Sequence, residues 1–296
     1  MTTPRIDAHQ HFWDPARADY PWMAAPALAP LRRAFGPDDL APLLRAAEIE
    51  RSIVVQCRSD VAETEEFLAI AAATPFVAGV VGWVDLCARD LDATIERLRR
   101  GPGGRYLVGI RHQVHDEPDA RWLARSDVRR GLAAVAAHDL AFDLLVRTRE
   151  LPAAIETVRA LPALRFVLDH LAKPPIAAGG DPDWAGRLAD LAALPNVWCK
   201  VSGLATEADW SDWDAARLQP FVAHGARVFG EDRLIWGSDW PVCTLAGSYR
   251  RVTAVLDQCL SGLGLRALAK ARGANAIAAY RLDIGSSPAR PGEGEG

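Results

Sequence analysis

Two histidines near the N-terminus have a spacing that suits joint action on one target. His9 and His11 stand in the stretch IDAHQHF at 6–12, whose composition indicates a β-strand. Successive side chains on a strand point to opposite faces, so Asp7, His9 and His11 are expected on one face. The two imidazoles then lie roughly 6.6 Å apart along the strand. At that distance they can converge on one metal ion, one water molecule or one substrate oxygen, whereas an edge strand with two unrelated histidines is the alternative.

Other polar side chains follow apolar stretches further along the chain, at points where short strands would end. They are Arg111, His112, His170, Lys200 and Asp239. A carboxylate and several imidazoles gathered in one place can activate a water molecule and polarise a carbonyl group. Taken singly, the aspartate could instead cap a helix, and the basic residues could form salt bridges. The functional interpretation therefore depends on whether the fold brings these strand ends together.

Apolar stretches of strand length alternate with helical patterns eight times along the chain. Strands are expected at 6–12, 52–56, 77–86, 107–113, 141–146, 165–170, 197–202 and 233–240. Helices are expected at 38–50, 63–73, 91–100, 128–137, 151–160, 184–194, 215–229, 248–260 and 266–280. This alternation indicates an α/β fold with a parallel sheet, and eight units indicate a single-domain (β/α)8 TIM barrel. An open doubly wound sheet is the alternative, but its GxGxxG motif follows no predicted strand.

A closed barrel would bring the chemically active residues together. In such barrels the active site lies at the carboxyl ends of the strands, and the first and last strands are neighbours. His9, His11 and Asp239 are then close in space, although about 230 residues of chain separate them. His170 reaches the same mouth from the sixth predicted strand.

Two segments depart from the strand–helix alternation. Residues 13–37 contain five prolines, which exclude a regular helix. A long loop inside a compact domain is usually functional, so we expect this one to form a lid or substrate wall over the mouth, with a plain connector as the alternative. Residues 285–296 (GSSPARPGEGEG) contain no large apolar side chain. We expect them to be a disordered tail after a barrel spanning 1–284.

The composition limits the classes of partner and compartment. The chain has 296 residues, of which 50% are hydrophobic, and a formal net charge of −4. It has no run rich in Lys and Arg and no apolar run long enough to span a bilayer, so neither nucleic acid nor membrane is an expected partner. Its five scattered cysteines form no CxxC motif, which fits a reducing cytoplasm. Nothing in the sequence indicates the oligomeric state.

Four motifs resemble those of one enzyme superfamily. They are DAHQHFW at 7–13, GIRHQ at 109–113, LDHLAKP at 168–174 and WGSDWP at 236–241. Together they resemble the amidohydrolase superfamily, and more closely its amidohydrolase-related lactonase branch, which includes L-fuconolactonase-like sugar lactonases and 2-pyrone-4,6-dicarboxylate lactonase. The similarity extends from residue 5 to about residue 282. The first and third motifs are the most similar to those of the sugar lactonases.

The resemblance implies a ligand set for at most one metal ion. The family's HxH pair, its later strand-end histidine and its last-strand aspartate correspond to His9, His11, His170 and Asp239. Binuclear members also carry a bridging Lys or Glu on the fourth strand and a histidine on the fifth, where this chain has Arg111 and the stretch AFDLLV at 141–146. The four residues could hold one divalent cation such as zinc. The lactonase branch includes enzymes that work without a metal, so none is expected to be required.

We therefore expect a hydrolase that opens a small-molecule sugar lactone, of L-fucono or L-rhamnono type, to the aldonic acid. Asp239 would act as general base toward water, while the three histidines would polarise the carbonyl and hold the oxyanion. Contacts with the substrate are expected from Arg111, His112, Lys200, Trp13, Trp83 and Trp240. The alternatives are a metal-dependent amidohydrolase or decarboxylase of the same superfamily, and a non-catalytic barrel that binds a sugar acid.

Overall fold

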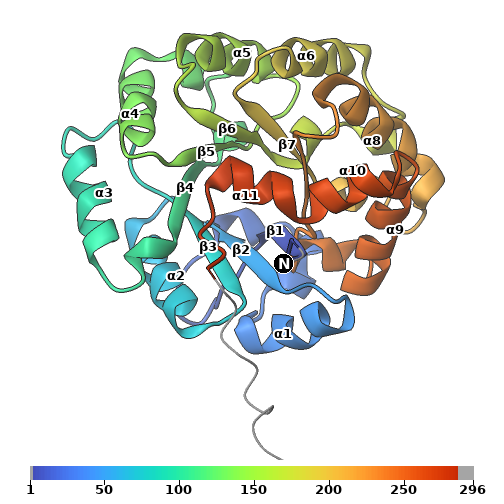
Figure 1. Ribbon diagram of the computed structural model, residues 1–296, viewed down its shortest axis with the longest axis horizontal. Coiled ribbons are helices and arrows are strands. Elements are labelled where there is room, and N and C mark those ends of the chain that lie inside the picture. Colours follow the sequence, from blue (N-terminus) through green and yellow to red (C-terminus); the bar gives the residue numbers. More distant parts are fainter. Residues whose placement is uncertain (1–2, 286–296) are drawn as a thin grey trace, which may run out of the picture.

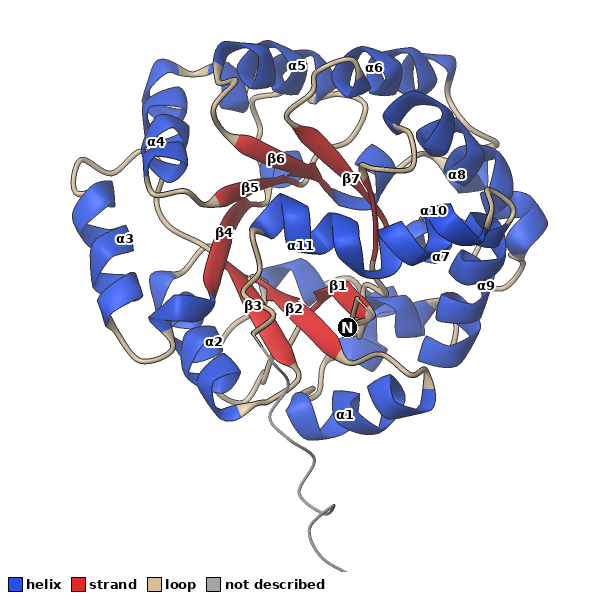
Figure 2. Cartoon of the chain, in the orientation of Figure 1, coloured by secondary structure: helices blue, strands red, loops and turns tan. Residues whose placement is uncertain are grey.

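Eight parallel strands pair in chain order in the computed structural model, which describes residues 3–285 (Figures 1 and 2). They are β1 (Ile6–Gln10), β2 (Arg51–Val55), β3 (Val77–Gly82), β4 (Leu107–His112), β5 (Ala141–Leu144), β6 (Arg165–Leu168), β7 (Val197–Val201) and β8 (Leu234–Trp236). Just after β8, the Asp239 N–H donates to the His9 carbonyl at 2.8 Å, and Trp240 bridges Gln10. These contacts bring the last strand beside the first, and the predicted (β/α)8 barrel is confirmed.

Helices cover the outside of the barrel (Figure 2). They are α1 (Pro37–Ala46), α2 (Val61–Ala73), α3 (Leu91–Arg100), α4 (Ser126–Ala137), α5 (Leu151–Ala160), α6 (Pro182–Ala192), α8 (Ala215–Phe229) and α9 (Tyr249–Ser261). Their starts follow local rules, since Asp60 caps α2 by accepting from the Ala62 N–H, and a proline opens α1. In residues 3–285, no helix combines the length and the apolar character needed to cross a membrane.

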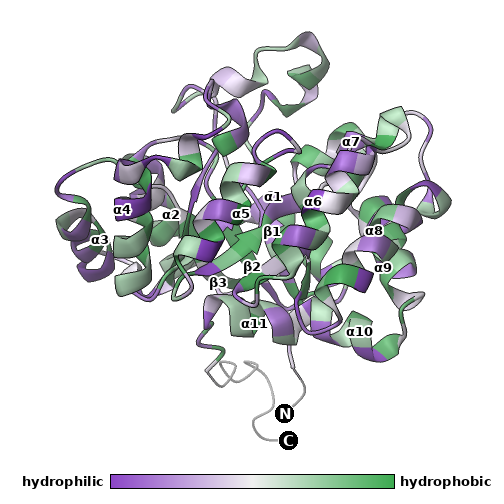
Figure 3. Ribbon diagram, turned by 90° about the horizontal axis from the view of Figure 1, so that it is seen from above, coloured by the Kyte–Doolittle hydropathy of each residue, from purple (hydrophilic) through white to green (hydrophobic). Residues whose placement is uncertain are grey.

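The end of the barrel from which the chain starts is covered by two further helices, α10 (Leu265–Ala269) and α11 (Asn275–Tyr280) (Figures 1 and 3). A five-residue π-helical turn joins them, so the single helix expected at 266–280 is interrupted. Tyr280 of α11 is buried and donates to Asp143 inside the barrel at 2.8 Å. The opposite end of the barrel is left for the loops that follow the strands.

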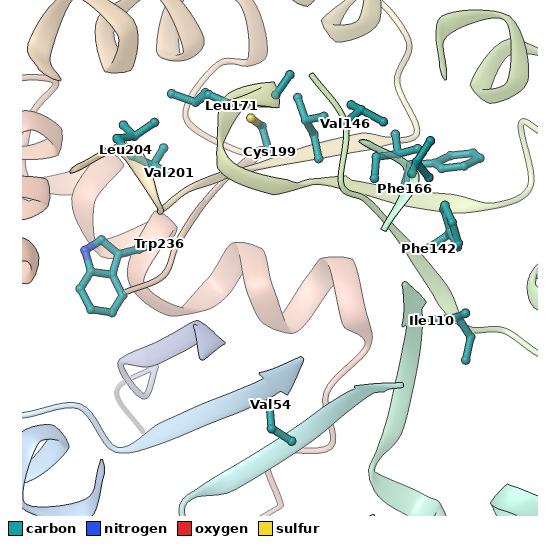
Figure 4. Close-up of a cluster of buried hydrophobic side chains, with 14 of the residues drawn as sticks. Val54, Ile110, Phe142, Val146, Phe166, Leu171, Cys199, Val201, Leu204 and Trp236 are labelled. Atoms are coloured by element: carbon teal, nitrogen blue, oxygen red, sulfur yellow. The ribbon is translucent and has the colours of Figure 1, made fainter. Parts of the chain in front are cut away.

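Two apolar layers hold the barrel. One lies between strands and helices and includes Val54, Phe142 and Phe166 (Figure 4). The other fills the barrel interior next to α11, where alternate strand residues such as Ile53 and Val167 pack together. Apolar side chains thus fill the covered end, which leaves the polar residues of the strands gathered toward the other end.

The pairing of β1 with β2 changes register in the middle of the strand. Asp7 lies opposite Ser52, but Gln10 lies opposite Val54, so three steps along β1 match two along β2. Asp7 contacts Tyr249 of α9, at 3.0 Å from its hydroxyl, whereas His9 points toward residues inside the barrel. The expectation that Asp7 shares a face with the two histidines is therefore wrong, because the irregular register interrupts the alternation.

The proline-rich loop at 13–37 is held by contacts within itself. Trp13 and Phe35 exchange two backbone hydrogen bonds, and two short 3-10 turns, Pro21–Met23 and Pro26–Leu31, lie between them. The expected tail at 285–296 lies outside the described residues except for Gly285, and the proposed domain limit at 284 stays a prediction.

Candidate active site

A cavity of about 370 Å³ opens at the carboxyl ends of the strands. Its deeply buried polar lining consists of His11, Arg111, His170 and Asp239, which we call the floor. Its walls come from loops after the strands, including the proline-rich loop. Barrels of this kind carry their active sites at this end, so the cavity is the candidate active site.

His9, His11 and Asp239 meet where the first and last strands adjoin. His9 Nε2 lies 3.2 Å from His11 Nε2, and Asp239 Oδ1 lies 3.4 Å from His11 Nε2. Nδ1 of His11 is 2.8 Å from the carbonyl oxygen of Val55, which can only accept a hydrogen bond. When the His11 ring is uncharged, its single proton therefore lies on Nδ1, and the lone pair of Nε2 faces Asp239.

His170 reaches the same point from a left-handed turn. Residues 170–173 have φ values between 49° and 59°, a conformation that costs about 1–2 kcal/mol for each residue with a side chain. Surrounding contacts must hold such a turn. Leu171 is fully buried, and its carbonyl accepts a hydrogen bond from Trp184 Nε1 at 2.7 Å. The turn places Nε2 of His170 3.9 Å from Asp239 Oδ1.

A group of buried charges adjoins the floor inside the barrel. The fully buried Lys200 ammonium lies 2.6 Å from Asp143 and 3.0 Å from Asp169. It also lies 3.1 Å from Nδ1 of His9. Arg111 donates to Asp169 at 3.0 Å. Each buried cation therefore has a carboxylate partner, as burial of a charge requires.

The electrostatics of the floor favour an ionised aspartate among neutral histidines. Burial alone would raise the pKa of Asp239, but the imidazoles of His170, His11 and His9 outweigh it and hold this pKa well below its usual range. Burial lowers the pKa of His170 to about 4. Burial and the nearby Lys200 ammonium lower the pKa of His9 well below its usual range. At neutral pH the site thus presents the ionised carboxylate of Asp239 beside the uncharged rings of His9 and His170.

The floor together with the adjoining His9 also fits a single divalent cation in the number and kind of its donors. His9, His170 and Asp239 each offer a ligand atom, and these atoms lie within 4.8 Å of one another. His11 adds a further imidazole nitrogen beside Asp239. Nitrogen and carboxylate donors in this number suit zinc.

The structure brings some of the sequence-predicted substrate contacts to the cavity and leaves others elsewhere. Arg111 lies in the floor. His112 instead bonds to Glu117 at 2.7 Å and stacks on Trp122. Lys200 is fully buried among carboxylates, so it is placed to act on neighbouring protein groups rather than on a substrate hydroxyl.

Trp13, Trp83 and Trp240 are not among the described residues that line the cavity. Trp13 and Trp240 are buried and pack on Phe35, and Trp83 donates its indole N–H to His112 at 3.0 Å. The aromatic wall comes from other residues, Trp22 of the proline-rich loop and Trp210 after β7. A position at a strand end therefore does not distinguish a tryptophan that packs against other side chains from one that lines the cavity.

Sequence reasoning missed a charged cluster in the cavity wall, which we call the rim triad: Arg147, Lys173 and Glu207. Glu207 lies 2.5 Å from the Lys173 ammonium and 2.9 Å from Arg147 Nη1. Lys173 stands in the motif LDHLAKP, which was a usable signal. Arg147 lies on the loop after β5, and Glu207 ends the short helix α7 (Leu204–Glu207) after β7, and at neither position does the sequence pattern give a register.

Comparisons with known proteins agree on one family. The family model described as Amidohydrolase matches residues 6–282. The L-fucono-1,5-lactonase of Burkholderia ambifaria is 46% identical over 285 residues, covering 95% of this chain and 97% of that protein. The L-fucono-1,5-lactonase of Burkholderia multivorans is 40% identical over 87% of this chain and 89% of its own length. A crystal structure of an amidohydrolase from Burkholderia multivorans with bound zinc superimposes with a TM-score of 0.88 at 39% identity, covering 94% of this chain and 99% of that one.

Proposed function

The chain belongs to the amidohydrolase family and is a lactone hydrolase of that superfamily, and we propose that its substrate is a sugar lactone of L-fucono type. One observation carries the proposal. A chain 46% identical to an L-fucono-1,5-lactonase places an ionised Asp239 beside imidazoles and Arg111 at the bottom of one cavity. Those are the groups that hydrolysis of an ester bond needs.

In the proposed mechanism Asp239 is the general base. A water molecule beside Oδ1 of Asp239 gives its proton to this carboxylate while its oxygen attacks the lactone carbonyl carbon. The lone pair on His11 Nε2 accepts the second hydrogen of that water and orients it. When the tetrahedral intermediate collapses, the ring C–O bond breaks and the leaving oxygen takes the proton from Asp239. The products are the aldonic acid and a restored carboxylate.

Two donors are proposed to stabilise the oxyanion. Arg111 can only donate hydrogen bonds, and it lies in the floor. His170 donates from Nε2 when the hydroxyl of Ser202, 2.8 Å away, donates to its Nδ1. His11 is not proposed as an oxyanion donor, because its Nδ1–H donates to the carbonyl oxygen of Val55. The oxyanion site thus combines a fixed cation with a neutral ring.

A metal is proposed to be optional. His170, Asp239 and a neighbouring histidine are the residues that would hold a divalent ion, and such an ion would add Lewis-acid polarisation of the carbonyl. The aspartate, the oriented water and the two hydrogen-bond donors described above do not depend on it.

The cavity walls suit a deoxy sugar. Trp22, Leu28 and Leu245 supply an apolar side, and the rim triad with Gln113 supplies charged and amide groups. A 6-deoxy lactone presents a methyl group and several hydroxyls, which match an apolar wall and a polar wall. The L-rhamnono type shares this chemistry and is the second candidate within the same proposal.

A substrate panel tests the proposal. Purified protein is assayed with a pH indicator on L-fucono- and L-rhamnono-lactones, γ-butyrolactone, a pyrone dicarboxylate and a cyclic amide. We expect kcat/KM for the L-fucono-lactone to exceed that for γ-butyrolactone by at least about a hundredfold, because buried polar groups are left unpaired by the bare ring. Equal rates on these two, or turnover only of the pyrone or the amide, would overturn the assignment. Binding of aldonate without turnover would support the non-catalytic alternative.

A further inference from the structure

Glu207 holds both cations of the rim triad with a single carboxylate. Lys173 Nζ donates to its Oε1 at 2.5 Å, and Arg147 Nη1 donates to its Oε2 at 2.9 Å. The side chains of Glu207 and Lys173 are 12% and 15% exposed, so this ion pair is largely shielded from water. Each carboxylate oxygen of Glu207 therefore faces a positive charge inside the cavity wall.

The two cations also keep Glu207 ionised. Burial by itself would raise the pKa of its carboxyl group, but the Lys173 ammonium and the Arg147 guanidinium outweigh burial and lower this pKa. At neutral pH one negative charge therefore stands between two positive charges. The triad as a whole carries one positive charge in excess.

The other charged residues of the lining offset this excess. In the described part of the chain the lining carries three basic side chains and three carboxylates, namely Arg111, Arg147, Lys173, Asp116, Glu207 and Asp239. Arg111 is in addition paired with Asp169 at 3.0 Å. The pKa of Asp116 is lowered by a hydrogen bond from His115 and by the nearby cations of the triad, so this carboxylate is charged as well. The lining as a whole thus offers no excess positive charge to an anion.

This balance of charge treats neutral and anionic ligands differently. A carboxylate or sulfonate group on a ligand would compete with Glu207 for the charge of both cations. A hydroxyl group differs, because it can accept a hydrogen bond from Arg147 or Lys173 and donate one to Glu207. An anion would also meet the ionised Asp239 in the floor. The wall therefore favours a ring that carries hydroxyl groups over one that carries acidic groups.

We infer that Glu207 is a specificity-determining residue that neutralises Arg147 and Lys173 and thereby makes the enzyme reject lactones that carry an acidic group. Loss of this carboxylate leaves two positive charges in the wall without their partner, which turns the rim into a site for anions. The inference rests on the proposed function and deepens it, because it concerns which lactones the site accepts.

Binding of succinate measures the charge of the rim without any reaction. This dicarboxylate is titrated calorimetrically into the full chain at about 0.15 M ionic strength, for wild type, Glu207→Gln and Asp116→Asn. Glu207→Gln should bind succinate at least about tenfold more tightly, because two neighbouring cations lose their carboxylate. Asp116→Asn is the matched control, since it removes the same charge from the same cavity. The Asp116 side chain is 57% exposed, so screening by solvent should keep its effect within about threefold.

A pair of lactones tests the consequence for catalysis. One is a neutral 6-deoxy sugar lactone, and the other has the same ring with a carboxylate in place of the methyl group. Glu207→Gln should raise the ratio of kcat/KM for the acidic lactone to that for the neutral lactone at least about tenfold. The change should lie in KM rather than kcat, because the triad is in the wall and the reacting groups are in the floor.

A second variant covers the case in which Glu207→Gln does not fold, as checked by circular dichroism. Arg147→Met leaves Glu207 in place and removes a cation that Glu207 already neutralises. Its succinate affinity should therefore stay within about threefold of wild type. A loss of about tenfold or more would mean that Arg147 is available to anions in wild type, and would overturn the inference.

Two further results would contradict the role of Glu207. One is an unchanged succinate affinity in folded Glu207→Gln, and the other is an equal gain in Glu207→Gln and Asp116→Asn. Because succinate binding needs no turnover, either result is distinct from a failure of the proposed function. That failure would appear as a wild-type enzyme that does not open the neutral lactone.

Discussion

Gly203 packs against the imidazole of His170 so closely that a Cβ atom at position 203 would lie 2.5 Å from Nδ1 of that ring. The same atom would lie 3.1 Å from Oδ2 of Asp239. Gly203 has a φ of 62°, in the left-handed region that favours glycine. The loop after β7 therefore supports the loop after β6 at the point where the proposed base and oxyanion donor meet.

Gly203→Ala should lower kcat by about a hundredfold, because displacing a catalytic group by about 1 Å costs that much. Gly179→Ala is the matched control. Its φ of 84° imposes a similar backbone strain, but a Cβ there meets no atom within 4 Å. Steady-state kinetics and thermal unfolding of both variants distinguish the effect of backbone strain at the glycine from the effect of displacing His170. Equal kcat values in the two variants would show that the contact with His170 does not matter.

Asp239→Asn should keep the fold and lower kcat by at least about a hundredfold, since an amide cannot take the proton of water. Asp116→Asn provides the comparison, because Asp116 lines the same cavity near its rim. The Asp116→Asn substitution should change kcat by only a few fold. Near-wild-type turnover in a folded Asp239→Asn protein would remove Asp239 from the mechanism.

The acid limb of the pH–rate profile should lie well below the ordinary histidine range. The pKa of Asp239 is held below its usual range by the adjacent imidazoles, and burial lowers the pKa of His170 to about 4. Acidification down to about pH 5 therefore protonates neither group, and kcat/KM should stay level between about pH 5 and about pH 7. Initial rates on a sugar lactone, corrected for spontaneous hydrolysis, give the profile. A decline centred near pH 6.5 would mean that protonation of a group other than Asp239 and His170 controls the reaction.

Those features of the site that follow from local sequence patterns could be predicted from the sequence. Apolar stretches at regular intervals gave the order of the eight strands, and closure of the barrel brought His9, His11 and Asp239 together. The parts that depend on packing could not. Residues 170–173 all have left-handed backbone conformations, which residues with a side chain disfavour. No local sequence pattern therefore predicts the turn that orients His170.

Burial of charge was likewise invisible in the sequence. Lys200 was expected at the cavity because polar residues at strand ends usually face the mouth, yet it lies inside with 0% exposure. Its burial depends on Asp143 of β5 and on Asp169, which directly follows β6. Which charged side chains form ion pairs across the barrel depends on the register of its strands, and a single sequence does not reveal that register.

Metal removal should leave the activity in place. Arg111 and the neutral His170 ring supply the proposed oxyanion donors from the protein itself. After dialysis against a chelator, elemental analysis should find less than one ion per chain, and kcat should fall by no more than about twofold. Loss of activity that zinc restores would show that the ion takes part in the reaction.

Asp7 should make the stability of the protein fall as pH rises. It is fully buried, and burial raises its pKa from 3.8 to about 6, although Ser238 and Tyr249 both donate to it. The folded state thus binds a proton more tightly than the unfolded chain. The resulting stabilisation is complete below pH 3.8 and is lost as pH rises through about 6.

Asp7→Asn tests this directly, because the amide imitates the protonated carboxyl at every pH. Between about pH 4 and about pH 7, the free energy of unfolding of wild type should fall by about 2.4 kcal/mol relative to the variant, at about 1.36 kcal/mol for each pKa unit. Urea unfolding of both proteins across this range measures the difference. Curves that run parallel with pH would mean that Asp7 titrates alike in the folded and unfolded chains, and that its carboxyl stays charged between β1 and α9.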